Sequence, residues 1–214
     1  MPFQYSCFVS YRHTTGSKGK MYTERIVDEI KEELEFQVSQ QVFLDVERLR
    51  GPQFYNEALA SALCQSVCMV VLYWPTYFSE EHTFCAREFK AMLDLEAKRI
   101  QALTDQAEKV NSLIIIIALR NFDLIPAEIK AGRLYYDFEP FTKKRNMRLD
   151  PDFQAKCLEI SQYIAGRVRA FQRVTSDLST GCTSFRLPAE QDVVPWLRQF
   201  VQPPQPLPTR GPTS

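Results

Sequence analysis

Two uninterrupted apolar runs constrain the fold of this chain more than any other feature. They cover residues 67–74 and 113–119, and each is far shorter than the roughly 20 residues that a membrane-spanning helix needs. A strand covered on only one face alternates apolar and polar residues, so continuous runs of this length predict strands that are buried on both faces. Strands of that kind belong to parallel sheets with helices packed on each side.

The rest of the chain alternates between short β-rich segments and segments with helical periodicity. In one of the latter, Ile26, Ile30 and Leu34 recur at the spacing of a buried helix face, while Asp28 and Glu32 face away. The expected strands are residues 5–11, 42–44, 67–74, 112–119 and 134–138, and the expected helices are 21–38, 54–65, 82 to about 105, and 150–171, with a longer connection at 120–132. The order βαβαβαβαβα predicts a flavodoxin-like three-layer α/β fold, with a five-stranded parallel sheet between helices.

The chain of 214 residues has room for one core and a tail. The alternating pattern stops near residue 173, so we expect one domain over residues 1–173. We expect a C-terminal extension over 174–214 that is proline-rich at 203–208 and partly disordered. Trp196, Leu197 and Phe200 are expected to dock in it as a short amphipathic turn.

Charge and cysteine usage exclude several functional classes. Basic and acidic residues both number 26, so the chain has no net charge to attract nucleic acid or an anionic membrane. The N-terminal residues lack the pattern of a secretory signal, which predicts a cytoplasmic protein. Six scattered cysteines without paired Cys-x-x-Cys spacing predict no metal site, and most are expected to be buried, reduced thiols.

Ligands of open parallel sheets bind beside the carboxyl ends of the strands. The loops expected at that edge are residues 10–20, 45–53 and 74–81. These loops are therefore the expected functional region.

Three segments in these regions resemble the Toll/interleukin-1 receptor (TIR) domain family. Cys7-Phe8-Val9-Ser10-Tyr11-Arg12 resembles its opening strand motif, and residues 43–54 resemble its second strand and BB loop. Residues 79–89, with Phe84-Cys85-Ala86-Arg87-Glu88, resemble the Ser, Trp-Cys-x-x-Glu pattern of the TIR domains that cleave NAD, with Phe84 in the place of the usual tryptophan.

The resemblance implies that Glu88 is a catalytic carboxylate and that NAD is a substrate, with no bound cofactor. Cleavage of the bond between nicotinamide and ribose leaves an oxocarbenium-like centre, which a nearby negative charge stabilises, much as in glycoside hydrolysis. Cys85 and Phe84 precede Glu88 by three and four residues, which predicts one helical face for all three. The residues expected to bind substrate are Phe8, Ser10, Tyr11, Arg12, Asp45, Glu47, Arg48, Phe54, Phe84 and Cys85.

Several of these residues also have a structural interpretation. Arg12 can hold a phosphate or the adenine end of NAD, or it can form a local ion pair. Phe8 is more typical of a core residue, whereas Phe54 can pack on a ring of the substrate. Tyr11, His13 and Tyr77 are expected at the rim of the site and not among the catalytic residues.

The sequence is also compatible with other functions. The main alternative is a non-catalytic TIR adaptor that signals through TIR–TIR contacts. A receiver domain would need an acidic cluster after the first strand, and a nucleotide-binding domain would need a glycine fingerprint; the sequence has neither. For an enzyme, the resemblance implies self-association that completes the active site. It also implies a role in innate or antiphage immunity, with a separate effector that senses the nucleotide product.

Overall fold

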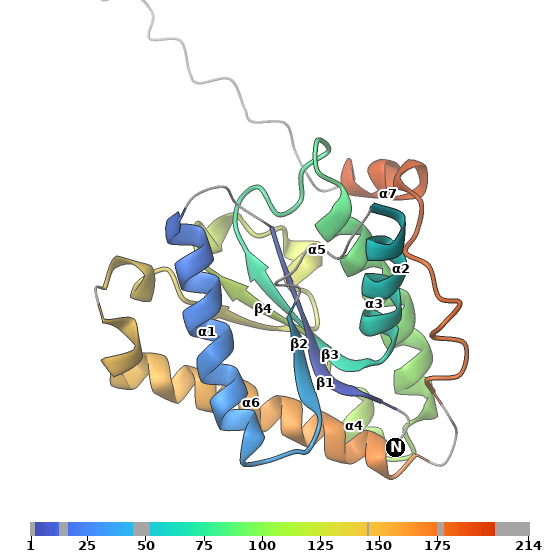
Figure 1. Cartoon of the computed structure of the whole chain (residues 1–214), viewed down its shortest axis with the longest axis horizontal. Coiled ribbons are helices and arrows are strands. Elements are labelled where there is room, and N and C mark those ends of the chain that lie inside the picture. Colours follow the sequence, from blue (N-terminus) through green and yellow to red (C-terminus); the bar gives the residue numbers. More distant parts are fainter. Residues whose placement is uncertain (1–2, 13–16, 45–51, 145, 175–177, 200–214) are drawn as a thin grey trace, which may run out of the picture.

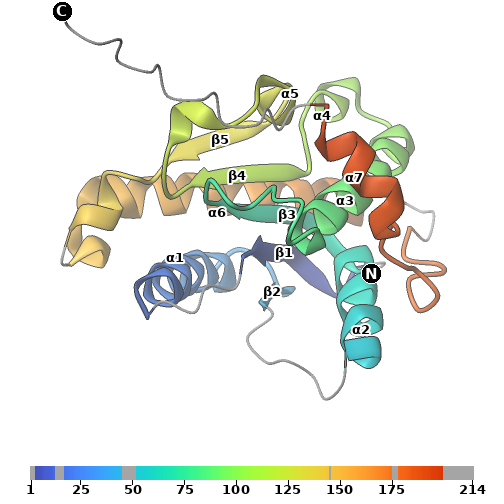
Figure 2. The ribbon, with the colours of Figure 1, turned by 90° about the horizontal axis from the view of Figure 1, so that it is seen from above.

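A computed structural model describes residues 3–12, 17–44, 52–144, 146–174 and 178–199, with the side chains of Ser17 and of residues 52–55 outside the description. Its centre is one sheet of five parallel strands in the order β2-β1-β3-β4-β5 (Figures 1 and 2). The strands are β1 (Tyr5–Tyr11), β2 (Gln41–Leu44), β3 (Ser66–Tyr73), β4 (Ile114–Ala118) and β5 (Leu134–Asp137). The predicted flavodoxin-like α/β fold is therefore confirmed.

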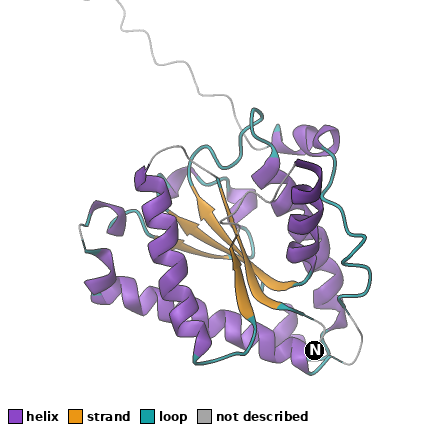
Figure 3. Cartoon of the chain, in the orientation of Figure 1, coloured by secondary structure: helices purple, strands orange, loops and turns teal. Residues whose placement is uncertain are grey.

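Two layers of helices cover the sheet (Figure 3). The long helices α1 (Ser17–Glu35) and α6 (Pro151–Gln172) pack together on one face, and α2 (Pro52–Cys64) and α3 (Phe84–Ala102) lie on the other (Figure 2). The shorter helices are α4 (Gln106–Lys109), α5 (Ala127–Lys130), α7 (Glu190–Leu197) and the 3₁₀ turns η1 (Phe122–Leu124), η2 (Phe141–Lys143) and η3 (Met147–Leu149). Among the described residues, no helix is both long and apolar enough to cross a bilayer.

The two apolar runs are the inner strands, as predicted. Every residue of β3 and of β4 is buried, whereas the outer strands β2 and β5 each keep partly exposed positions. The predicted limits of the main elements differ from the observed ones by a few residues at most. Helices α4 and α5 were missed because a single helical turn is too short to show periodicity.

A buried carboxylate fixes the start of β4 against α3. Glu96 Oε1 accepts hydrogen bonds from the Ser112 hydroxyl at 2.6 Å and from the Leu113 backbone N–H at 2.5 Å. An unpaired N–H at this depth would destabilise the fold by about 1–3 kcal/mol. Glu96 is therefore a structural residue, although it lies on the same helix as Glu88.

The C-terminal segment contains a disulfide that the sequence did not predict. Cys182 is bonded to Cys64 at the end of α2, whereas Cys7, Cys68, Cys85 and Cys157 are free and buried. Most of the cysteines are thus free and buried, as expected, and Cys64 and Cys182 are the two that are not reduced thiols. These two cysteines are 118 residues apart in the sequence, and only the folding of the tail onto α2 brings them together. Disulfides are rare in reducing compartments, so this bond does not favour the expected cytoplasmic location.

The role of Glu96 can be tested by substitution. Glu96→Ala should lower the free energy of unfolding by about 2–3 kcal/mol, because two buried donors lose their acceptor. Glu96→Gln keeps an acceptor oxygen and should cost less. Urea denaturation measures both, with Asp94→Ala, at an exposed position of the same helix, as the control. A loss from Glu96→Ala no larger than that of the control would contradict this role.

The cysteine pairing predicts a simple thiol count. A colorimetric thiol reagent should find no reactive thiol in the native protein, because all four free cysteines are buried and burial raises the pKa of Cys7, for example, to about 12. Unfolding without reductant should release four thiols, and unfolding after reduction should release six. Six thiols without reduction would restore the expectation drawn from the sequence.

Candidate functional site

The candidate site lies at the carboxyl edge of the sheet, between β1 and β3. The chain leaves β1 toward α1 on one face and leaves β3 toward α3 on the opposite face, so the two connections diverge at this point (Figures 1 and 2). Such a divergence is where open α/β sheets bind their ligands. The residues singled out in the first and third TIR-like segments meet here.

A short hydrogen bond joins these two segments. The Ser10 hydroxyl, near the end of β1, donates to Glu88 Oε2 at 2.6 Å. Ser10 is 1% exposed and Glu88 is 7% exposed, so the bond lies in a largely water-free environment. Glu88 is the fifth residue of α3, close to the helix end whose dipole attracts negative charge. Residues 78 positions apart are thereby held in contact.

A third side chain, Tyr77, forms a hydrogen bond with Ser10. The Tyr77 hydroxyl, in the loop after β3, lies 2.5 Å from Ser10 Oγ. Ser10 has one proton and donates it to Glu88, so Tyr77 must donate to Ser10. Burial, together with the nearby Cys85 and Glu88, raises the pKa of Tyr77 well above its usual value, so the phenol remains a neutral donor. Tyr77, Ser10 and Glu88 thus form one directed network.

The expected position of Tyr77 at the rim is wrong, because its side chain is completely buried. The sequence did carry a signal for this. Tyr77 and Phe78 are adjacent aromatic residues in a loop that follows Pro75, and a pair of large aromatic side chains in a loop usually packs on something.

Two further predicted residues surround the network. Arg12 Nη1 donates to the Thr76 carbonyl at 2.9 Å and so joins the end of β1 to the loop that carries Tyr77. Cys85 shares the buried face of α3 with Glu88. Burial, and then the negative charge of Glu88, raise the pKa of the Cys85 thiol well above its usual value, although Arg12 opposes this. A raised pKa favours the protonated thiol over the thiolate.

The remaining predicted residues take less central places. Phe8 is buried in the core and stacks on Phe43 with ring centroids 5.4 Å apart. Tyr11 is partly buried at the end of β1. Phe84 is 37% exposed, and the guanidinium of Arg87 lies 5.2 Å from its ring. Phe84, the first residue of α3, is therefore more exposed than Cys85 and Glu88.

The second TIR-like segment cannot be placed at the site. Asp45, Glu47 and Arg48 lie outside the described residues, and so does the side chain of Phe54, whose backbone belongs to α2. His13 also lies outside them. Within the described part of the chain, no cluster of three His, Cys, Asp or Glu side chains is arranged to hold a metal ion.

Comparison of the chain with protein-family models and with curated proteins finds no match.

The hydrogen-bond network predicts a specific pattern of stability. Ser10→Ala should lower the free energy of unfolding by about 2–3 kcal/mol, because it leaves the buried Tyr77 hydroxyl and the Glu88 carboxylate without their shared partner, and Tyr77→Phe should cost about 1–2 kcal/mol. The double variant should lose less than the sum of the two, because both substitutions break the same bond. Urea denaturation of the four proteins completes the cycle. Additive losses would show that the two hydroxyls act independently.

Proposed function

We propose that this chain is a TIR-type enzyme that cleaves the bond between nicotinamide and ribose in NAD, with Glu88 as the catalytic carboxylate. The observation that carries the proposal is the hydrogen bond between Ser10 and Glu88. It brings the first and third TIR-like segments together at the edge of the sheet where ligands of this architecture bind. A glutamate serving only as a solvated surface residue would not be buried and held in this way.

The main requirement for cleavage of the bond between nicotinamide and ribose is a negative charge beside the ribose. The electrons of the glycosidic C–N bond leave with nicotinamide, which departs as a neutral molecule, so no acid has to protonate it. The ribosyl centre that remains is positively charged, and a fixed carboxylate in a low-dielectric environment stabilises it as it forms. Water, or another nucleophile from the substrate itself, then attacks this centre. The products are nicotinamide and ADP-ribose, or a cyclic or modified ADP-ribose.

The residues around Glu88 suit the supporting roles. Ser10, itself held by Tyr77, fixes the orientation of the carboxylate before substrate arrives, which removes the free-energy cost of ordering it during the reaction. Arg12 is partly exposed at the same edge, where its guanidinium can contact the phosphates of NAD. NAD is thus a substrate, and the proposal requires no metal and no resident cofactor.

The resemblance extends the proposal beyond this site. Asp45, Glu47, Arg48 and Phe54 of the second TIR-like segment are proposed to contribute to the site, and a second copy of the chain is proposed to complete it by self-association. The proposed setting is a cytoplasmic immune response, in which a separate effector senses the product. These extensions rest on the TIR-like residues and not on the geometry described above.

The test is chromatographic analysis of NAD incubated with concentrated protein. The wild type should release nicotinamide, and Glu88→Gln should be slower by about a hundredfold or more, because it removes the charge and keeps the shape. Asp94→Asn removes a carboxylate from an exposed position of the same helix and should leave the rate unchanged.

Two outcomes would contradict the proposal. If Glu88→Gln releases nicotinamide as fast as the wild type, Glu88 is not the catalytic group. If the wild type releases none, even at concentrations that drive self-association, the alternative of a non-catalytic TIR adaptor becomes the better account.

A further inference from the structure

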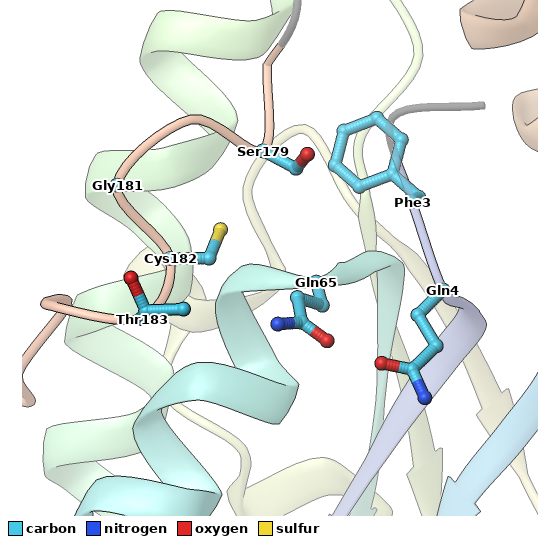
Figure 4. A pocket seen from close by; sticks show the side chains of 7 residues that line it. All are labelled: Phe3, Gln4, Gln65, Ser179, Gly181, Cys182 and Thr183. Carbon is cyan, nitrogen blue, oxygen red and sulfur yellow. The ribbon is translucent and has the colours of Figure 1, made fainter.

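The C-terminal segment, residues 178–199, runs along the outside of α2 and α3 from one edge of the sheet to the other (Figures 1 and 2). We call this segment the strap. Its first part is bonded through Cys182 to Cys64, at the end of α2 and next to the amino edge of β3. A cavity of about 280 Å³ lies beside this attachment, between the strap and the residues that precede β1 and β3 (Figure 4). The strap is therefore fixed at the edge opposite to Glu88.

Polar contacts continue along the strap toward the candidate site. Arg186 pairs with Glu57 of α2 at 3.1 Å, and the Pro188 carbonyl accepts a hydrogen bond from Arg87 Nε of α3 at 2.7 Å. Beyond α7, Arg198 donates two hydrogen bonds to Glu80 Oε2, at 2.7 and 3.0 Å. Glu80 lies in the loop that carries Tyr77. The far end of the strap thus contacts a loop that builds the site.

Apolar contacts join the same end of the strap to the residues beside Tyr77 and Glu88. Trp196 of α7 stacks on Phe89, with centroids 6.2 Å apart, and meets the edge of Phe78 at 6.3 Å. Phe78 and Phe89 also touch each other at 5.3 Å. Phe89 follows Glu88 in α3, and Phe78 follows Tyr77 in the loop. Trp196 therefore packs on the immediate neighbours of two members of the hydrogen-bond network.

Tyr77 and Phe78 transmit this contact through the loop. Their rings meet at right angles with centroids 4.8 Å apart, and both side chains are buried. Tyr77 reaches Ser10 on one side, and Phe78 reaches Trp196 on the other. Any loosening of Phe78 must therefore disturb the Tyr77 hydroxyl, because interiors packed at this density transmit small shifts to their neighbours.

We propose that the strap is part of the functional site and that Trp196 is a positioning residue for Tyr77 and Glu88. Trp196 acts through Phe78 and Phe89, because it packs on the loop that carries Tyr77 and on the first turns of α3 that carry Glu88. The disulfide holds the other end of the strap on α2, so that α7 stays close to its docking surface even when its packing fluctuates. The catalytic consequence rests on the proposed function, but the positioning of the loop does not.

Cys85 offers a direct reporter of this positioning. Its thiol is buried beside Tyr77 and Glu88, so it becomes accessible to an alkylating reagent only when this corner of the fold opens. Cys157 on α6 is fully buried on the opposite face of the sheet and reports on opening of the whole fold. The alkylation rate of each thiol can be measured in one sample by mass spectrometry of peptides, without reductant.

The test compares three proteins with the wild type. Trp196→Ala should raise the alkylation rate of Cys85 by about tenfold or more and change that of Cys157 by less than about twofold. Trp196→Phe keeps an aromatic ring and should restore most of the protection. Phe153→Ala, which truncates a buried ring on α6, is the matched control. It should raise the alkylation rate of Cys157, and it should not raise that of Cys85 preferentially.

The outcomes separate this inference from the proposed function. An equal rise at all thiols in Trp196→Ala, or no rise at Cys85, would overturn the inference. If Cys85 alone becomes reactive while the wild type cleaves no NAD, the strap positions the loop and the proposed reaction fails. If the wild type does cleave NAD, Trp196→Ala should lower kcat by about tenfold and leave KM nearly unchanged, because the interaction lost acts on the carboxylate in the transition state. A change confined to KM would contradict the positioning role.

Discussion

The hydrogen bond from Ser10 to Glu88 is the constraint on which the candidate site depends. A buried carboxylate is stable only when its oxygens are satisfied, and here one is bound by a hydroxyl at the end of β1, which is itself bound by Tyr77. The three groups come from a strand, a loop and a helix that meet only because the sheet places β3 beside β1. The parallel order of the strands therefore positions the carboxylate, and the proposed chemistry follows from that position.

Two buried glutamates on α3 show how one helix can combine structural and proposed catalytic residues. Glu96 accepts from a backbone N–H and a serine at the start of β4, at the amino edge of the sheet. Glu88 lies two turns earlier, at the carboxyl edge, where it accepts a hydrogen bond from Ser10 of the first TIR-like segment. Burial alone does not distinguish them. The edge of the sheet that each one faces, and the segments that contact it, give them different roles.

Much of the fold could be predicted from the sequence, because buried parallel strands leave a direct pattern. The continuous apolar runs of β3 and β4 and the helical spacing of Ile26, Ile30 and Leu34 follow from burial alone. Glu88, Ser10, Arg12 and Cys85 were identified from the resemblance, and the structure places them together. What the sequence could not reveal depends on contacts between distant segments. Tyr77 joins the network through a loop conformation, and the pairing of Cys64 with Cys182 requires the tail to fold back along α2.

The segment after residue 173 is packed on the domain more extensively than the sequence indicates. Residues after 173 look like an appendage in the sequence, yet Val193 and Leu197 are fully buried and Trp196 packs on the helix that carries Glu88. The core thus continues past the expected domain limit and reaches the outer side of the candidate site. The expected docking of Trp196 and Leu197 is confirmed, and Phe200 lies outside the described residues. The full extent of α7 was not predicted, because two helical turns are too short to show a clear period.

The proposed reaction requires the ribose next to nicotinamide to bind beside Glu88. A crystal structure of the Glu88→Gln variant soaked with NAD tests this requirement, since this variant should bind the substrate without consuming it. We expect the side chain at position 88 within about 2.6–3.2 Å of a ribose hydroxyl, with Ser10 still in contact with it. NAD bound at another place, or a fully occupied site in which residue 88 contacts only Ser10 and Tyr77, would contradict it.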